Sequence, residues 1–171
     1  MRTIHPLNWH LVEPDLIIPG IPRVGSTSVT KGFPNMVTPE NAKNYKRRLA
    51  FIRHPIQRLI SAFGHLNKLG YIDMVEGIPP RERSWEEFID YILSHTDRHW
   101  FPQIRRLHFN GRWVPTHLER FENLATVWPR YTNVEFPHFN KTGYIPVTND
   151  YRKAEIDSYY EKDLELWYGI A

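Results

Sequence analysis

Residues 17–28, IIPGIPRVGSTS, place two glycines, an arginine and three hydroxyl side chains directly after a short apolar run. Gly20 and Gly25 are separated by four residues, which is the glycine spacing of a nucleotide-binding P-loop. That motif continues with Lys and then Ser or Thr, whereas Ser26 here follows the second glycine directly, and the cation of the loop is Arg23. The loop therefore predicts an oxyanion site built from backbone N–H groups, hydroxyls and a guanidinium, without the lysine of ATP and GTP sites.

Residues 48–61 repeat this design of an apolar run, a polar turn and a helix. Arg53 ends the run RLAFIR, Arg58 follows in the next helix, and Ser61 lies one turn beyond it. Ligands of open α/β sheets bind beyond the carboxyl ends of strands, where the next helix presents N–H groups to an anion. Arg53 and Ser61 are candidates for holding a second phosphate; a surface arginine and a surface serine are the alternative. Two separated phosphates indicate a 3′-phosphorylated adenine nucleotide rather than ATP.

The elements that must position these residues can be read from the apolar pattern. Residues 15–19 and 48–53 are predicted buried strands, because each is a short apolar run that ends in a polar turn. A helix is predicted over residues 54–70, with Pro55 in its first turn and an apolar side chain every three or four residues. A further helix begins at Ser84, which forms a capping box with Glu87.

The C-terminal third continues the alternation of strands and helices. Residues 115–124 are predicted to be a short strand that passes into a helix, and residues 149–169 a single long helix capped by Asn149 or Asp150. Alternating strands and helices predict a layered α/β fold with a parallel sheet.

The composition fits a folded chain with a weak positive charge. Its 171 residues are 41% hydrophobic, and the formal net charge is +3. We expect one compact domain over residues 1–171, with an anionic ligand but no nucleic-acid partner. The absence of cysteine excludes disulfides, thiolate metal sites and thiol nucleophiles. The first 20 residues hold no long apolar run, so we expect no signal peptide and no membrane span, and predict a cytoplasmic protein.

Two segments, IPRVGSTSV and FIRHPIQRLISAF, resemble the signature motifs of sulfotransferases that use 3′-phosphoadenosine-5′-phosphosulfate (PAPS) and release the 3′,5′-bisphosphate PAP. The likeness is greatest to the carbohydrate sulfotransferase branch. Further similar segments follow in the same order: HWFPQ (99–103), ERFENL (119–124), PHFNKTG (137–143) and YYEKDLELWYG (159–169). The resemblance implies a P-loop-type three-layer fold, with a central parallel sheet flanked by helices, and PAPS as the sulfuryl donor.

The resemblance also assigns roles to individual residues. The 5′-phosphosulfate would be held by the first motif, namely Arg23, Gly25, Ser26, Thr27 and Ser28. The 3′-phosphate would be held by Arg53 and Ser61, and Lys141 would reach the nucleotide from a late loop. Arg23 replaces the usual lysine, so it can stabilise charge on the leaving oxygen but is a poor proton donor.

Sulfuryl transfer to a hydroxyl also needs a base, and no pattern of metal ligands suggests a metal. His99, between charged and aromatic residues in DRHWFPQ, is the predicted base. A packing role beside Trp100 is the alternative. His54 is the next candidate, followed by Glu40 and His65.

The acceptor is predicted to be a hydroxyl of a carbohydrate, with a small alcohol, a phenol or a lipid as the alternative within the same chemistry. A module that binds the 3′,5′-bisphosphate nucleotide without catalysis is the competing class of function. A P-loop kinase is disfavoured because the loop lacks its lysine.

Overall fold

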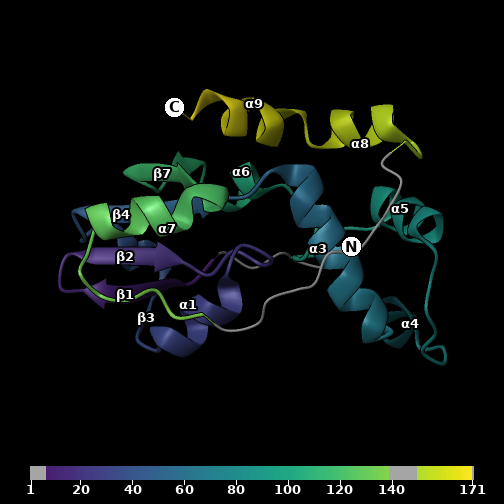
Figure 1. Ribbon diagram of the computed structural model, residues 1–171, viewed down its shortest axis with the longest axis horizontal. Helices are drawn as coiled ribbons and strands as arrows, with labels where there is room; N and C mark the ends of the chain where they lie inside the picture. The colour runs from purple at the N-terminus through teal and green to yellow at the C-terminus, as the bar shows by residue number, and fades with distance from the viewer. Residues whose placement is uncertain (1–6, 139–149, 171) are drawn as a thin grey trace.

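The computed structural model describes residues 7–138 and 150–170. Its main sheet has five strands in the order β3–β1–β2–β4–β7, and Figure 1 shows them side by side. Their bounds are β1 (Trp9–Glu13), β2 (Leu16–Pro19), β3 (Met36–Val37), β4 (Arg47–Ile52) and β7 (His117–Arg120). The predicted strands over 15–19 and 48–53 are thereby confirmed as β2 and β4.

The sheet is mixed, so the prediction of a parallel sheet is wrong for part of it. β2, β4 and β7 are parallel, whereas β1 runs antiparallel to both β2 and β3. The two-residue turn Pro14–Asp15 joins β1 to β2. Such a short turn can only connect antiparallel neighbours, since a parallel pair requires a crossover of a dozen or more residues.

The central strands are buried on both faces. All four residues of β2 and the last four of β4 are inaccessible, as expected for strands covered by helices or loops on either side. Val29 of α1 (Ser26–Gly32) and Val127 of α7 (Leu124–Val127) belong to the largest apolar core around them. This core fixes the carboxyl end of β2, where the predicted anion loop begins.

A second apolar core belongs to the helices on the right of Figure 1. It is formed by α3 (Pro55–Lys68), α4 (Tyr71–Glu76), α5 (Trp85–Ser94) and α8 (Lys153–Tyr159). α3 confirms the predicted helix, with Pro55 at its first position, and it continues directly from the end of β4. The sheet and the helical half therefore meet where β4 enters α3.

The predicted single helix over 149–169 is wrong, because the chain breaks it at Tyr160. α8 ends there and α9 (Glu161–Gly169) begins on the other side of it. The Tyr160 ring is buried and its hydroxyl donates to the carbonyl of Trp100. Asp163, also buried, accepts from the backbone N–H groups of Gln103 and Ile104. These anchors attach the C-terminal helices to the segment around residue 100.

Short elements complete the described chain. They are α2 (Pro39–Ala42), α6 (Gln103–Arg106), the hairpin of β5 (His108–Phe109) and β6 (Arg112–Trp113), and the 3₁₀ turns Phe121–Asn123 and Trp128–Arg130. The predicted strand-to-helix passage over 115–124 is confirmed, as β7 leads through a 3₁₀ turn into α7.

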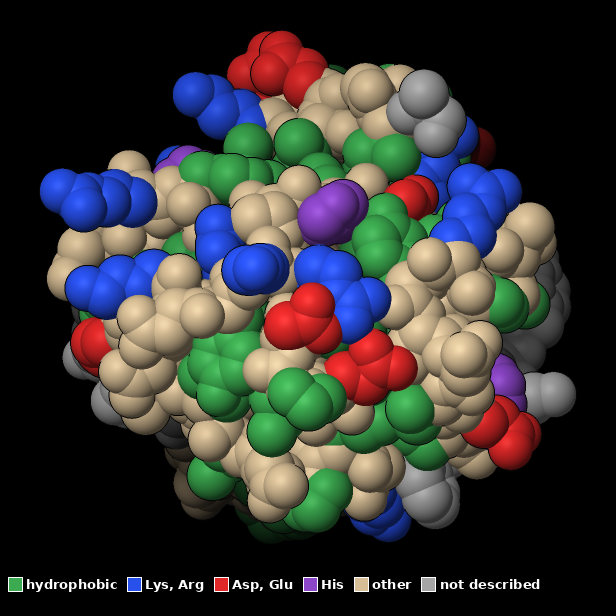
Figure 2. All heavy atoms as spheres, turned by 90° about the vertical axis from the view of Figure 1, so that its left-hand side faces the viewer, with side chains coloured by type: hydrophobic (Ala, Val, Ile, Leu, Met, Phe, Trp, Pro, Cys, Tyr) green, Lys and Arg blue, Asp and Glu red, His purple; other side chains and the backbone are tan. Residues whose placement is uncertain are grey.

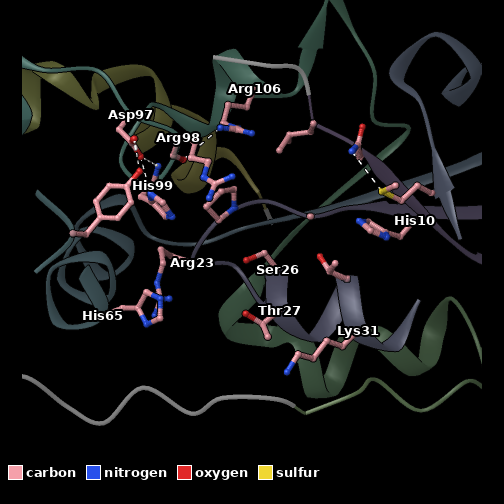
Figure 3. A pocket seen from close by; sticks show the side chains of 17 residues that line it. His10, Arg23, Ser26, Thr27, Lys31, His65, Asp97, Arg98, His99 and Arg106 are labelled. Carbon is pink, nitrogen blue, oxygen red and sulfur yellow. Dashed lines mark hydrogen bonds and ion pairs between the residues drawn. The ribbon is translucent and has the colours of Figure 1, made fainter. Parts of the chain in front are cut away.

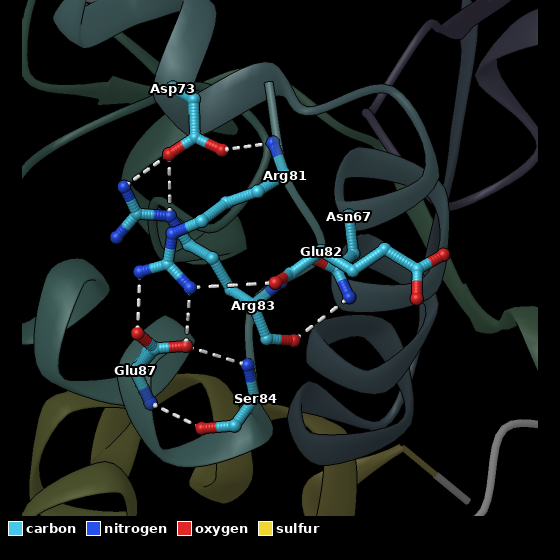
Figure 4. Close-up of polar contacts among 7 residues, drawn as sticks. All are labelled: Asn67, Asp73, Arg81, Glu82, Arg83, Ser84 and Glu87. Atoms are coloured by element: carbon cyan, nitrogen blue, oxygen red, sulfur yellow. Dashed lines mark hydrogen bonds and ion pairs between the residues drawn. The ribbon is translucent and has the colours of Figure 1, made fainter. Parts of the chain in front are cut away.

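Polar contacts fasten the segment between α4 and α5, and Figure 4 shows them. Buried Asp73 accepts from the backbone N–H of Arg81 and forms an ion pair with Arg83. The predicted capping box is confirmed, since the Ser84 side chain accepts from Glu87 and the Glu87 side chain accepts from Ser84. α5 is thus held at a fixed start, and its end leads into the residues 95–102 that carry His99.

Candidate active site

The β2–α1 loop has an unusual backbone that follows from its sequence. Arg23 and Gly25 both lie in the left-handed region, with φ of 66° and 68°. Glycine adopts this region freely, whereas an arginine there is uncommon and costs strain. A Cβ on Gly25 would lie 3.0 Å from the Phe121 ring, so the backbone approaches its neighbour more closely than another residue would allow. The loop is therefore a tightly turned backbone cradle at the carboxyl end of β2.

The guanidinium of Arg23 brings the two predicted motifs together. Its Nε and Nη2 donate to the hydroxyl of Ser61 in α3, at 3.3 and 3.0 Å. Burial lowers the pKa of Arg23, and the charges of Arg53 and Arg58 lower it further. Positive charge from both motifs therefore gathers in one place.

Arg58 is the structural link between the motifs and the segment that carries His99. It is 1% exposed and donates to three backbone carbonyls. Nε binds Pro22 at 3.0 Å, Nη1 binds Phe101 at 3.1 Å, and Nη2 binds Arg98 at 3.4 Å. Arg58 is thus a positioning residue that fixes the anion loop relative to residues 98–101.

His99 forms a dyad with Asp97. Its Nδ1 lies 2.7 Å from Asp97 Oδ1, and the backbone N–H of His99 donates to the same oxygen at 2.9 Å. The Tyr71 hydroxyl donates to the other oxygen at 2.9 Å. Burial raises the pKa of Asp97, but the bonds to His99 and Tyr71 outweigh it and lower the pKa overall. An ionised Asp97 accepts a hydrogen bond from Nδ1–H of His99, and in this tautomer Nε2 carries the lone pair that can accept a proton.

The anion loop and the dyad line one cavity of about 720 Å³. In Figure 3, Asp97, His99 and Arg23 follow one another along one side, with Ser26 and Thr27 nearby. The cationic lining residues are Arg23, Lys31, Arg98 and Arg106, and Asp97 is the carboxylate among the described residues of the lining. The cavity suits an anionic ligand.

The remaining predicted site residues do not line the cavity in the described part of the chain. Ser28 is buried in α1. Arg53 is partly buried, does not line the cavity among the described residues, and exchanges backbone hydrogen bonds with the Gln103 side chain. Lys141 lies outside the described residues. The sequence therefore gathers Arg23, Ser26, Thr27 and His99 in the cavity.

The three alternative bases differ in whether they line the cavity that holds His99. His65 lines the cavity, and its pKa is lowered by burial and by the nearby Arg23 and His99. His54 begins α3 and packs edge-on against Trp167, with ring centroids 4.8 Å apart. Glu40 is exposed in α2. Neither His54 nor Glu40 lines the cavity of His99 in the described part of the chain.

Sequence reasoning missed Tyr71, Asp97 and Arg98. The signal for Asp97 was present, because an Asp–x–His spacing within one turn lets the carboxylate reach the imidazole. Tyr71 carried no such signal, since it meets Asp97 only through the packing of α4.

Comparison with models of protein families identifies the family to which the chain belongs. The model of the sulfotransferase family matches residues 25–162, which include the dyad, the whole second motif and the first motif from Gly25 onwards. The chain belongs to the sulfotransferase family. No curated protein and no solved structure showed significant similarity to it. Membership supports transfer of a sulfuryl group to a hydroxyl-bearing acceptor, and thus a transferase. None of the described helices is both long and apolar enough to cross a membrane.

Proposed function

We propose that this sulfotransferase uses PAPS as donor and a hydroxyl of a carbohydrate as acceptor. The observation that carries the proposal is the shared cavity of Arg23, Ser26, Thr27 and the His99–Asp97 dyad, which come from distant parts of the chain. The carbohydrate preference rests on the resemblance of the two motifs to the carbohydrate branch. The P-loop-type three-layer fold, the single domain and the cytoplasmic location stay predictions.

The residues of the cradle fit a phosphosulfate. The left-handed backbone turn at Gly25 and the partly buried hydroxyls of Ser26 and Thr27 would offer donors to non-bridging oxygens, and Arg23 would offer fixed charge. Gly25, Ser26, Thr27 and Ser28 would hold the 5′ end, while Arg53, Ser61 and Lys141 would hold the 3′-phosphate. When bound, PAPS supplies the sulfuryl group.

The dyad provides the base. His99 Nε2 takes the proton from the acceptor hydroxyl as its oxygen bonds to sulfur, and Asp97 stabilises the imidazolium that forms. Arg23 would stabilise the negative charge left on the phosphate oxygen of the donor when its bond to sulfur breaks. No proton needs to come from Arg23, which is consistent with arginine at this position.

Binding and catalysis are tested separately. Calorimetric titration without magnesium should show PAP binding far more tightly than AMP or ATP, and Arg53→Ala should remove this preference. His99→Ala should retain PAP binding but lose about 10²–10⁴-fold in transfer of labelled sulfuryl from PAPS to a panel of sugars, alcohols and phenols. His117→Ala, an exposed histidine in β7, is the matched control.

The competing class is a module that binds the nucleotide without catalysis. PAP binding with no transfer to any acceptor would favour it. Equal affinity for PAP and AMP would contradict the 3′-phosphate site and the PAPS proposal with it. Full activity of His99→Ala would contradict only the base assignment.

A further inference from the structure

The cavity carries more positive charge than the anion loop accounts for. Arg98 and Arg106 line it beside His99, whereas Ser26 and Thr27 come from the loop side. Figure 3 shows Arg98 and Arg106 together, next to the dyad and away from the start of α1. The phosphosulfate assigned to the loop does not need these two arginines.

Arg106 is partly buried and forms no ion pair with the described residues. Its Nε is inaccessible and has no hydrogen-bond partner in the described part of the chain. Its Nη1 reaches only the carbonyl of Arg98, at 3.4 Å. Burial, followed by the charges of Arg58 and Arg98, lowers the pKa of Arg106 to about 10. A partly buried guanidinium remains protonated at neutral pH even so, and its charge calls for an anion.

The nearest carboxylate is already engaged. Asp97 opposes the lowering of the Arg106 pKa, but its two oxygens bind His99 and Tyr71. Asp163 lies near Arg58, where it accepts from two backbone N–H groups of α6. The arginine pair therefore retains net positive charge at the wall next to the base.

We propose that Arg98 and Arg106 form a second oxyanion subsite, which binds an acidic group of the acceptor, such as a carboxylate, while the acceptor hydroxyl meets His99. This inference rests on the proposed function, because it places the acceptor on the dyad side and the donor on the loop side. It defines the acceptor class as an acidic hydroxyl compound, of which an acidic sugar is one example. A neutral alcohol would bring no negative charge to the two guanidiniums.

The test uses inorganic sulfate as a probe that does not depend on the acceptor skeleton. The protein is saturated with PAP and titrated with sodium sulfate at constant ionic strength. Wild type should bind sulfate, and Arg98→Gln and Arg106→Gln should each weaken that binding at least tenfold. Arg105→Gln is the matched control, because Arg105 is exposed, adjacent in α6 and absent from the described lining of the cavity.

Arg98→Gln is the variant that we expect to fold like the wild type, so its result can be interpreted even if Arg106→Gln does not fold. The Arg98 side chain is exposed, and the hydrogen bonds from Arg58 and Arg106 go to its backbone carbonyl, which the substitution keeps. Absence of sulfate binding to the PAP-saturated protein, or equal loss in Arg105→Gln, would overturn the subsite.

A second measurement addresses the acceptor itself. Methyl β-D-glucuronide and methyl β-D-glucoside differ in one carboxylate, and kcat/KM should favour the glucuronide at least tenfold in wild type and not in Arg98→Gln. Preference for the glucoside would overturn the acceptor class. The sulfate titration decides the subsite even where neither sugar is turned over.

The two proposals fail in different ways. If PAP does not bind, but sulfate binds in a manner that depends on Arg106 and not on Arg23, the PAPS proposal falls and the subsite stands. If sulfate binding depends on Arg23 and not on Arg106, the subsite falls.

Discussion

The arginines at the two ends of the main sheet have different kinds of partner. At the amino-terminal end, Arg47 of β4 forms ion pairs with Glu13 and Asp15, at 2.8 and 2.5 Å. Figure 2 shows this end, where acidic and basic side chains touch. At the carboxyl end, Arg23 and Arg58 bind a hydroxyl and backbone carbonyls, and Arg106 has an Nε that is unpartnered among the described residues.

The ion pairs of Arg47 stabilise the fold, whereas Arg23 and Arg106 at the carboxyl end line a cavity that suits an anionic ligand. The carboxylates around Arg47 raise its pKa, since their hydrogen bonds and charges favour the protonated form. Burial and neighbouring arginines lower the pKa of Arg23 and of Arg106. The hydrogen bonds of Arg23 to Ser61 and of Arg58 to backbone carbonyls leave the charge of these two arginines unneutralised by those acceptors.

The largest effect is expected for Arg58→Met. Three backbone carbonyls lose a charged donor inside the protein, and we expect a loss of about 3–4 kcal/mol in the free energy of unfolding. The comparison variant is Arg47→Met, whose side chain is 30% exposed and whose ion pairs are screened by solvent. Its loss should be much smaller. Urea unfolding monitored by tryptophan fluorescence measures both.

Equal losses in the two variants would contradict the distinction between the ends. A stable Arg58→Met that binds PAP normally would also show that the carbonyl contacts do not position the anion loop.

An intermediate effect is expected for Asp97→Asn. The amide can orient His99 in the wrong tautomer and cannot stabilise the imidazolium, so kcat should fall about 10²-fold with little change in the affinity for PAP. Tyr71→Phe, which removes only one hydrogen bond to Asp97, should lose less. The pH dependence of kcat distinguishes positioning from packing, because a packing role would leave the profile of Asp97→Asn unshifted.

The smallest effect concerns His10, a buried histidine of β1 that pairs with Ile18 near the carboxyl end of β2. Burial lowers its pKa below the ordinary 6.5, and the hydrogen bond to the Phe33 carbonyl only partly opposes this. The unfolded chain then binds the proton more readily, so stability falls as the pH decreases from about 6.5 towards the pKa of the folded state. Unfolding in urea at a series of pH values should show a shallower decline for His10→Gln. Identical slopes would contradict the buried neutral state.

Much of the framework was predictable because it is local. β2, β4 and α3 follow from short apolar runs and from Pro55, and the capping box at Ser84 depends on residues three apart. The break at Tyr160 was not predictable, because it is fixed by a hydrogen bond to Trp100, 60 residues away. Periodicity alone favours continuing the helix, and tertiary anchoring overrides it.

The residues of the candidate site also fall into those that local sequence predicts and those that depend on tertiary packing. Arg23, Ser26, Thr27 and His99 could be chosen from motifs, since each lies in a distinctive stretch of sequence. The part of Arg58 as a buried link could not, because nothing local distinguishes it from a helix-surface arginine. The position of Arg98 and Arg106 beside the dyad could not be predicted either, because that proximity arises from the packing of residues 95–106 against α3.

The three carbonyl contacts of Arg58 also govern how a ligand enters. They join the anion loop to the backbone on both sides of His99, so these two walls of the cavity form one mechanical frame. These hydrogen bonds favour a constant position of the anion loop relative to His99 when a ligand binds or leaves. Passage must therefore be accommodated by the remaining lining, which includes Asn8, Thr30 and the exposed Met36.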